Sequence, residues 1–313
     1  MKKYVVTGGA GFIGSALVRS LVARDDGEVH IIDNLFSGKK QNLKEIWPRI
    51  ELHISDIRNY DEILPVIRNA DTAFHLAAIP SVPRSIHEPV PSHEVNIDGT
   101  FNVFRAAAEG EARRVVYAAS SSAYGDTAVL PKVETMTPQP KSPYAAQKLM
   151  GEYYVGVFNS CFGLDTVSLR FFNVYGERQD PSSPYSGVIS LFMTALLDRR
   201  APAIFGDGEQ TRDFTYVEDV VDLTLKAASA RGVAGKVYNA GNGHRYSLNE
   251  VWRTLQTIEG VEIAPVHAAP RAGDVRDSLA SIDAARELIG YEPKVNVREG
   301  LQRTIAAFRQ LPT

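Results

Sequence analysis

Two side chains four residues apart, Tyr144 and Lys148, have the types and the spacing that a proton-transfer site needs. On a helix, positions i and i+4 lie on one face, so the phenol and the ammonium group share a pocket. A neighbouring cation favours the phenolate and can lower a tyrosine pKa by about 1 to 3 units. Tyr144 is therefore predicted to act as a general base near neutral pH. A serine-rich stretch, YAASSSAYG at 117–125, precedes the pair.

The stretch TGGAGFIGS at 7–15 is predicted to hold a nucleotide. Its glycines fit the pattern GxGxxG, in which the backbone turns sharply and approaches a pyrophosphate with no Cβ in the way. The helix that follows would direct its N-terminal N–H groups at the phosphates. Asp33, about 20 residues further on, can accept both ribose hydroxyls of adenosine and repels a 2′-phosphate. These residues favour NAD, whose oxidised nicotinamide would add further positive charge beside Tyr144, and Lys39 and Lys40 keep NADP as an alternative.

Short apolar runs alternate with longer stretches of helical period up to about residue 175. Buried parallel strands are predicted at 4–6, 29–32, 73–76, 115–118 and 166–169. Helices that cross back over a sheet are predicted at 12–24, 60–68, 95–109 and 143–159. This alternation predicts an α/β protein with a Rossmann-type doubly wound parallel sheet.

The second half of the chain has a different organisation, with loops rich in Pro, Gly and Ser such as QDPSSPYSG at 179–187. Residues 1–175 are expected to form the nucleotide-binding domain. Residues 176–313 are expected to form mainly a smaller C-terminal substrate-binding domain. The stretch 216–240 is expected to return to the first domain, with a strand at 237–241 joining the main sheet.

The composition argues against several other classes of protein. The net charge is −3, so there is no basic excess to bind nucleic acid. Cys161 is the only cysteine, which excludes an intrachain disulfide and a thiolate metal cluster and fits a reducing cytoplasm. The seven histidines form no HExxH or other close pair in the sequence, so no metal site is expected. No run approaches the about 20 apolar residues of a membrane span, and a soluble protein is expected.

The motifs together resemble those of the extended short-chain dehydrogenase/reductase family, and within it the nucleotide-sugar 4-epimerases. The resemblance covers nearly the whole chain. Its motifs are TGGAGFIG at 7–14, IIDNLFSG at 31–38, SDI at 55–57, HLAA at 75–78, SSSAYG at 120–125, YAAQK at 144–148, FFNVYG at 171–176 and RAGDVRDSL at 271–279. The resemblance implies that Ser120, Tyr144 and Lys148 are catalytic.

The resemblance also implies a set of NAD-binding residues. These are Gly8, Gly11, Phe12, Ile13, Gly14, Asp33, Asn34, Ser37, Gly38, Asp56, Ile57, Leu76, Ala77, Ala78, Asn96, Tyr144, Lys148 and Phe171. Asp33 and Asn34 would hold the adenosine ribose. Asp56 and Ile57 would flank the adenine. Asn96 would hold the nicotinamide half and its ribose together with the lysine.

A second implied set would bind a UDP-sugar. It consists of Ser81, Ser120, Ser121, Ser122, Asn173, Phe205, Arg212, Arg271, Asp274 and Ser278. Arg212 and Arg271 would grip the diphosphate, because bidentate guanidinium donors suit it. Asn173 would contact the diphosphate too, and Phe205 would stack on uracil. Asp274 would take ribose hydroxyls or organise the second arginine.

The positions after Ser120 distinguish between reactions within the family. Related 4,6-dehydratases carry an Asp and Glu pair there, and related decarboxylases resemble STSEVYG, whereas this chain has Ser121 and Ser122. Neither serine can serve as a carboxylate acid or base. What remains is hydride transfer plus one proton. In a 4-epimerase, Tyr144 would take the proton of the sugar 4-hydroxyl while C4 gives its hydride to a tightly bound NAD, and a transient 4-keto sugar would turn over before the hydride returns.

Sugar choice depends on few residues. Ser278 falls where the family faces the sugar 2-substituent, and its small side chain leaves room for an acetamido group. The stretch SVPRS at 81–85 resembles the branch that prefers N-acetylhexosamines, with Ser81 as a sugar contact. One departure is Ser281, where most relatives have Asp. The expected substrates are UDP-N-acetylglucosamine and UDP-N-acetylgalactosamine, with UDP-glucose and UDP-galactose as a second pair.

Alternative functions remain open at this point. They are a 4-epimerase of UDP-glucose or UDP-glucuronate, a net redox dehydrogenase or reductase of a nucleotide sugar, and a non-catalytic NAD-binding regulator. The intact set of Ser120, Tyr144 and Lys148 argues against the regulator. The predicted helices at 95–109 and 143–159 match those that form a four-helix dimer interface in relatives, so a homodimer is expected by analogy.

Overall fold

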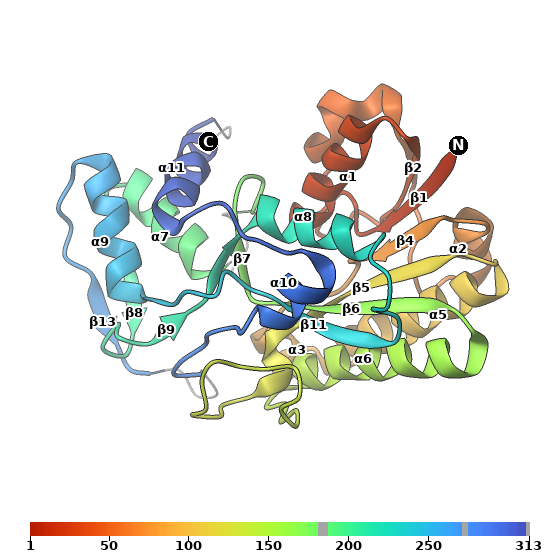
Figure 1. Cartoon of the computed structure of the whole chain (residues 1–313). Coiled ribbons are helices and arrows are strands. Elements are labelled where there is room, and N and C mark those ends of the chain that lie inside the picture. Colours follow the sequence, from red (N-terminus) through yellow and green to blue (C-terminus); the bar gives the residue numbers. More distant parts are fainter. Residues whose placement is uncertain (181–186, 271–274, 311–313) are drawn as a thin grey trace.

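Seven strands form the central sheet of the computed structural model, which describes residues 1–180, 187–270 and 275–310 (Figure 1). In spatial order they are β3 (Glu51–His53), β2 (Gly27–Ile32), β1 (Lys2–Thr7), β4 (Thr72–His75), β5 (Arg114–Ser120), β6 (Asp165–Phe171) and β11 (Lys236–Ala240). Every neighbouring pair is parallel. The strand order reverses between β1 and β4, and ligands bind beyond the carboxyl ends of the strands at such a point.

Helices cover both faces of this sheet, because its strands are apolar on both sides. On one face lie α1 (Phe12–Arg24), α8 (Val217–Ala227) and α10 (Asp283–Ile289). On the other face lie α2 (Tyr60–Ile67), α5 (Thr100–Glu109) and α6 (Pro143–Phe162). Figure 1 shows α1 and α8 above the sheet and α5 and α6 below it. The predicted doubly wound α/β fold is confirmed.

Two elements of the sheet domain differ from the sequence-based prediction. Strand β3 was not predicted, because it is only three residues long, at the sheet edge, and Leu52 is its single apolar residue. The helix expected over 95–109 begins as a π-helix, η2 (Glu94–Gly99), before it continues as α5. Asn96, in the middle of this wide turn, bonds the backbone of Ile79, a distant pairing that helical periodicity does not report.

A smaller second region lies beside the carboxyl edge of the sheet, at the left of Figure 1. It has its own core, which includes Phe192, Met193, Tyr216 and Trp252. Its elements are β7 (Asn173–Tyr175), α7 (Val188–Leu197), β8 (Ala203–Phe205), β9 (Thr211–Arg212), β10 (Phe214–Tyr216), β12 (Tyr246–Ser247), α9 (Leu248–Glu259), β13 (Val266–Ala268) and α11 (Val297–Phe308). Between β10 and β12 the chain returns to the main sheet, where β11 pairs in parallel with β6.

Short helical segments complete the described chain. They are η1 (Lys40–Arg49), α3 (Val82–His87), α4 (Pro89–His93) and η3 (Ser121–Tyr124). None of the helices in the described ranges combines the length and the apolar character that crossing a membrane requires.

Candidate active site

The glycine-rich turn at the end of β1 is closely packed against its neighbours. Gly8 has φ +72°, and a Cβ on it would lie 2.8 Å from the backbone nitrogen of Ala77. A Cβ on Gly14 would lie only 2.1 Å from the carbonyl oxygen of Gly8. Gly11 precedes α1, which begins at Phe12 and has no side-chain cap, so the N–H groups of its first turn are directed at the end of β1. Ile13 lies in the same turn. This cradle fits a pyrophosphate.

Asp33 lies directly after β2, beside this turn. Its two carboxylate oxygens accept backbone N–H groups, Oδ2 from Ala10 at 2.9 Å and Oδ1 from Leu35 at 2.8 Å. A Cβ on Gly38 would lie 2.8 Å from both oxygens, so this position has no room for a larger residue. Burial raises the pKa of Asp33, and the two backbone hydrogen bonds oppose the rise. The carboxylate is held at the place where an adenosine ribose would lie in a fold of this kind.

A polar group continues the site from Asp33 towards the adenine end. Asn34 donates from Nδ2 to Asp56 Oδ2 at 2.7 Å. Arg58 donates from Nε and Nη2 to the same carboxylate, both at 2.9 Å. These hydrogen bonds from Arg58 are the main reason why the pKa of Asp56 falls to about 2. Ile57 is buried beside this carboxylate, and Ser37 is exposed in the loop after Asn34.

The three candidate catalytic residues meet where β5 ends and α6 begins. Ser142 caps α6 by accepting from the backbone nitrogen of Ala145, and Pro143 occupies the first helical position. Lys148 is buried and donates from Nζ to the carbonyl oxygen of Ala118 at 2.9 Å. Ser120 ends β5, and its hydroxyl is hydrogen-bonded to Tyr144.

The protonation of Tyr144 and Lys148 in the protein without NAD differs from the prediction. Burial raises the pKa of Tyr144 to about 12, opposed by the hydrogen bond with Ser120. Burial also lowers the pKa of Lys148 to about 7, opposed by the charge of Glu152. The expectation that Lys148 lowers the tyrosine pKa is wrong for the protein by itself. The physical reason is that both groups are removed from water, which disfavours the charged form of each.

Two serines follow Ser120 in η3. Ser122 donates to Ser120 Oγ from both its backbone nitrogen, at 3.2 Å, and its hydroxyl, at 2.8 Å. Ser121 lies beside it in the same turn. Phe171 ends β6 directly opposite Ser120 in the parallel register. The serine hydroxyls therefore cluster beside the tyrosine, and no carboxylate stands at these two positions.

The loop after β4 borders both parts of the site. Ala77 donates from its backbone to Thr7 Oγ1 at 3.2 Å, which ties Leu76 to Ala78 to the end of β1. Asn96 is buried, and its amide is bonded to both backbone groups of Ile79 and to Gln147 Oε1. Its polar atoms thus brace the loop, and its contact with the nicotinamide half stays a prediction.

Ser81 and Ser85 connect this loop to α6. Ser81 Oγ accepts from the backbone nitrogen of Arg84 at 3.1 Å and caps α3. Ser85 Oγ accepts from the backbone nitrogen of Tyr144 at 3.1 Å, a contact that sequence reasoning missed. The segment expected to face the sugar therefore lies against the first turn of the catalytic helix.

The expected nucleotide-sugar residues come together in the second region around Asp213. Asn173 Nδ2 donates to the carbonyl oxygen of Asp213, and Arg212 precedes it in β9. The backbone nitrogen of Ser278 donates to the carbonyl oxygen of Thr211 at 3.1 Å. Phe205 ends the neighbouring β8. The other two expected residues, Arg271 and Asp274, lie outside the described residues.

Asp213 itself was not predicted. Its buried carboxylate accepts backbone N–H groups of Asn242 at 2.7 Å, Gly243 at 3.0 Å and Ala280 at 3.1 Å. Burial raises its pKa and these hydrogen bonds oppose the rise. In the sequence TRDF, Asp213 stands between two short strands, and no local pattern points to such a buried anchor.

A second unpredicted pair lies behind the catalytic lysine. Arg170, in β6, donates from Nε to Glu152 Oε1 at 2.9 Å and from Nη2 to Oε2 at 2.7 Å. Both side chains are only 3% exposed. Glu152 follows Lys148 by four positions on α6, so helical spacing alone places it on the catalytic face.

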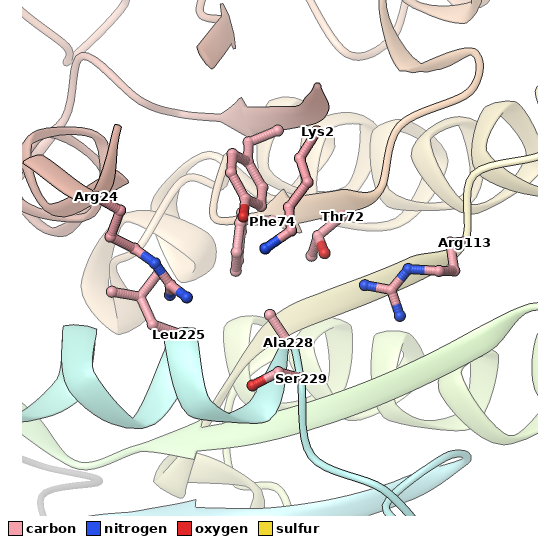
Figure 2. A pocket seen from close by; sticks show the side chains of 9 residues that line it. Lys2, Arg24, Thr72, Phe74, Arg113, Leu225, Ala228 and Ser229 are labelled. Atoms are coloured by element: carbon pink, nitrogen blue, oxygen red, sulfur yellow. The ribbon is translucent and has the colours of Figure 1, made fainter. Parts of the chain in front are cut away.

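Two cavities lie outside the catalytic residues. One of about 40 Å³ opens at the amino edge of the sheet, where Lys2, Thr72 and Arg113 line it (Figure 2). It is at the opposite end of the strands from Ser120. Another, of about 80 Å³, lies between Asn173, Phe214 and the start of α7.

The histidines are less dispersed in space than in sequence. Pairing of β2 with β3 brings the side chains of His30 and His53 within 3.3 Å of each other, with Glu51 beside both. Spacing along the sequence does not report this group, because strand pairing joins residues 23 positions apart.

Comparison with known proteins identifies the family. The profile of the NAD dependent epimerase/dehydratase family matches residues 4–241. A UDP-glucose 4-epimerase of Mycolicibacterium smegmatis is 39% identical over 309 residues, which are 97% of this chain and 98% of the relative.

Two solved structures have nearly the same fold. A UDP-N-acetylglucosamine 4-epimerase from Methanobrevibacter ruminantium M1, in complex with UDP-N-acetylmuramic acid, has a TM-score of 0.94 and 37% identity, with 98% of each chain covered. A UDP-glucuronic acid 4-epimerase from Bacillus cereus, in complex with UDP-glucuronic acid and NAD, has a TM-score of 0.92 and 30% identity, with 98% and 99% covered.

The chain belongs to the NAD-dependent epimerase/dehydratase family. It is an enzyme of that family, and NAD is its cofactor. The predicted family, enzyme class and cofactor are confirmed.

Proposed function

We propose that the protein inverts the configuration at C4 of a UDP-sugar, with UDP-N-acetylglucosamine and UDP-N-acetylgalactosamine as the preferred pair and UDP-glucose and UDP-galactose as the second. The observation that carries the 4-epimerase reaction is the cluster of Ser120, Tyr144 and Lys148 beside a nucleotide cradle. Ser121 and Ser122 occupy the positions where a dehydratase needs carboxylates. The relatives named above, all UDP-sugar 4-epimerases, support this choice.

The residues of the chain would divide the chemistry between them. When bound, NAD supplies a hydride acceptor that returns the hydride to C4. Ser120 would hydrogen-bond the sugar O4. Tyr144 would act as the phenolate, which the positive charge of oxidised nicotinamide would favour together with Lys148, and it would receive the hydroxyl proton and give it back. Lys148, fixed on the carbonyl oxygen of Ala118, would place its ammonium group near the cofactor ribose and the tyrosine. No net oxidation results, so the cofactor can remain tightly bound throughout.

The cradle around Gly8, Gly11 and Gly14 would hold the NAD pyrophosphate, and Asp33 would hold the adenosine ribose. We assign residues 1–175, with 216–240, to NAD binding and residues 176–313 mainly to the nucleotide sugar. The buried anchor Asp213 supports the second assignment, because it fixes the strand that carries Arg212.

At the far end of the substrate, Arg212 and Arg271 would bind the diphosphate together with Asn173. Phe205 would stack on the uracil, and Asp274 would bind ribose hydroxyls or orient the second arginine.

Preference for N-acetylated sugars is argued from Ser278. Its side chain is small, and its backbone is held in place by a hydrogen bond to Thr211. The space beside the sugar 2-substituent would therefore stay open. UDP-glucuronate is an alternative substrate after these two pairs, because a solved relative with 30% identity binds it.

The test is an NMR time course of purified protein with UDP-N-acetylglucosamine, UDP-glucose and UDP-glucuronate in separate tubes, without added NAD. Faster conversion of the acetylated sugar is expected. Conversion of only one of the other two sugars would make the substrate assignment wrong and leave the epimerase reaction in place. Conversion that needs added NAD in stoichiometric amounts would indicate a net redox enzyme, and no conversion with NAD present would favour the regulator.

We also propose a homodimer that forms through α5 and α6. Apolar side chains are exposed along these two helices, namely Phe101, Met150, Tyr153, Val157 and Phe162. Light scattering on the wild type and on a Val157→Glu variant tests this, with a dimer expected for the first and a monomer for the second. The proposed compartment is the reducing cytoplasm, since the single cysteine, Cys161, is free and exposed.

A further inference from the structure

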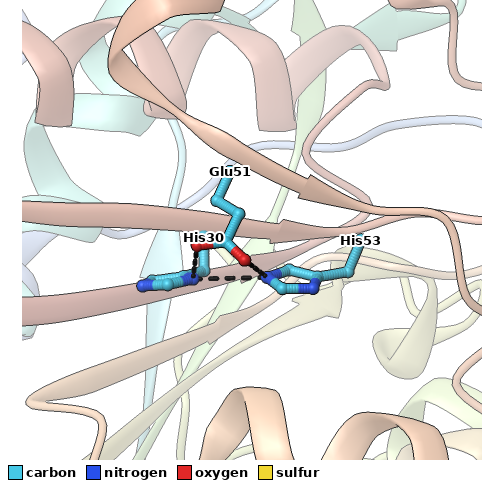
Figure 3. A group of neighbouring side chains, drawn as sticks. All are labelled: His30, Glu51 and His53. Carbon is cyan, nitrogen blue, oxygen red and sulfur yellow. Dashed lines mark hydrogen bonds and ion pairs between the residues drawn. The ribbon is translucent and has the colours of Figure 1, made fainter.

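A compact group of metal-ligand side chains lies at the edge of the main sheet, away from the catalytic residues (Figure 3). His30 is in β2, and Glu51 and His53 are in β3. The parallel register sets His30 opposite Glu51 and Ile32 opposite His53. Residues two apart on a strand point to the same face, so all three side chains converge on one side of the sheet.

The separations of their ligand atoms are close to the edge length of a tetrahedral site, and each imidazole nitrogen faces a different oxygen of the Glu51 carboxylate. His30 Nδ1 lies 3.3 Å from His53 Nε2 and 3.4 Å from Glu51 Oε2, and His53 Nε2 lies 3.3 Å from Glu51 Oε1. Zn²⁺ with bonds of about 2.0 to 2.1 Å in tetrahedral geometry separates its ligand atoms by about 3.3 to 3.4 Å. We propose that His30, His53 and Glu51 bind a divalent transition-metal ion of the zinc type, with water in the fourth position.

The surroundings suit two neutral imidazole ligands. The rings of His30 and His53 are stacked with centroids 5.6 Å apart, which fixes their orientation. The other ring nitrogen of His30, Nε2, is buried and lies 3.5 Å from Glu28 Oε2. Nε2 has no hydrogen-bond partner among the described residues, so the nearby Glu28 carboxylate could accept its N–H as an outer partner and leave the lone pair of Nδ1 for the metal.

Access and charge also allow an ion to enter. The side chains of His30 and His53 are 13% and 27% exposed, whereas that of Glu51 is 63% exposed and forms the open side. Glu28 and Glu51 supply two negative charges. The positive charge of Lys3, which pairs in register with Glu28 on the neighbouring strand, opposes them in part.

The position of the site gives the metal a structural role. His53 ends β3, and its carbonyl oxygen accepts the backbone nitrogen of Asp33 at 3.2 Å. A bound ion would link the three-residue β3 to β2 next to Asp33, the residue proposed to bind the adenosine ribose. It would stabilise the fold and retention of NAD and leave the chemistry at Tyr144 unchanged.

The test uses the full-length protein with its NAD, treated with a chelator and then titrated with Zn²⁺ and with Co²⁺. One ion per chain is expected, with the visible absorption of four-coordinate Co²⁺. Loss of a residue that only orients a metal ligand costs roughly 10- to 100-fold in metal affinity. His53→Asn and Glu51→Gln each remove a ligand, so each should raise the dissociation constant for Zn²⁺ by more than this. His244→Asn, at an exposed histidine outside the cluster, is the matched control and should bind as the wild type does.

The variants separate metal loss from misfolding. Glu51 is largely exposed, so Glu51→Gln is expected to keep the far-ultraviolet circular dichroism of the wild type. Equal affinity in the wild type, His53→Asn and Glu51→Gln, or only six-coordinate Co²⁺ in the wild type, would overturn the site. Either result leaves the 4-epimerase proposal untouched, because no step of this test measures epimerisation.

Discussion

The carboxylate of Glu152 receives two hydrogen bonds from the guanidinium of Arg170, and both groups are almost fully buried behind Lys148. The negative charge of Glu152 raises the pKa of Lys148 against the lowering effect of burial. Arg170 in turn lowers the pKa of Glu152, which burial raises. The charge of Glu152, which is itself paired with Arg170, thus keeps Lys148 closer to its protonated form than burial alone would.

Removal of the Glu152 charge tests this arrangement. Glu152→Gln leaves Arg170 as a buried cation without its partner, and the free energy of unfolding should fall by about 3 to 5 kcal/mol. Urea denaturation measures the change. Asp198→Asn removes one side of an exposed pair with Arg200 and should cost less than about 1 kcal/mol. Similar small losses in both variants would contradict the role given to the buried pair.

Removal of the Tyr144 hydroxyl tests the proposed base. Tyr144→Phe should lower the rate of epimerisation by about 10²- to 10⁴-fold, because no other group at that place can exchange the proton. NMR assays give the rate, and absorbance after denaturation gives the NAD content, which should be unchanged. Tyr153→Phe, at an exposed tyrosine of the same helix, should retain full activity. Full activity of Tyr144→Phe would refute the mechanism.

The stability of NAD-free protein should depend on pH through Lys148. Its pKa is about 7 in the folded protein against an ordinary value of 10.5, so between these values the unfolded chain binds more protons than the folded one. The contribution of Lys148 to stability therefore increases as the pH rises from about 7 to 10.5. Thermal unfolding of the wild type and of Lys148→Met across this range measures it. The stability of the wild type relative to Lys148→Met should increase with rising pH, and a difference that does not depend on pH would contradict the lowered pKa.

The tight packing of the glycine-rich turn predicts that Gly→Ala changes at Gly14, in the turn, and at Gly156, in α6, have opposite effects. Gly14→Ala would place a Cβ 2.1 Å from the carbonyl oxygen of Gly8, so loss of bound NAD and a lower melting temperature are expected. Gly156→Ala, within α6, meets no atom within 4 Å and should stabilise the helix by about 0.5 to 1 kcal/mol. Calorimetry and NAD content check both variants. Retention of NAD in Gly14→Ala would show that the turn can relax.

Ser278 predicts the sugar preference. Ser278→Tyr should fill the space for an acetamido group and lower the conversion of UDP-N-acetylglucosamine relative to UDP-glucose by about 10- to 200-fold. Ser278→Ala keeps the space and should leave the ratio near that of the wild type. Competition assays with both sugars give the ratio directly. An unchanged ratio in the tyrosine variant would place the 2-substituent elsewhere.

The parts of the fold that follow from local pattern were predictable from sequence. The apolar runs of the sheet and the glycine turn with Asp33 each report a local requirement, burial or close approach of the backbone. Tyr144 and Lys148 were found for the same reason, since a single helix fixes their spacing.

The features that sequence reasoning missed depend on contacts between distant segments. Asn96 bonds Ile79, Asp213 bonds the backbone at Asn242 and Ala280, and His30 meets His53 only through strand pairing. Protonation was misjudged in the same way, because the burial that raises the pKa of Tyr144 comes from the assembled site and from no single helix.

The return of the chain to the main sheet as β11 has a consequence for any attempt to divide the protein. A fragment ending at residue 175 would lack this strand, and β6 would then present unpaired backbone groups along its whole length. Such bare edges recruit other chains and promote aggregation. The nucleotide half therefore cannot serve as a detachable module, and exchange of sugar specificity between relatives is better attempted by grafting individual loops than by swapping halves.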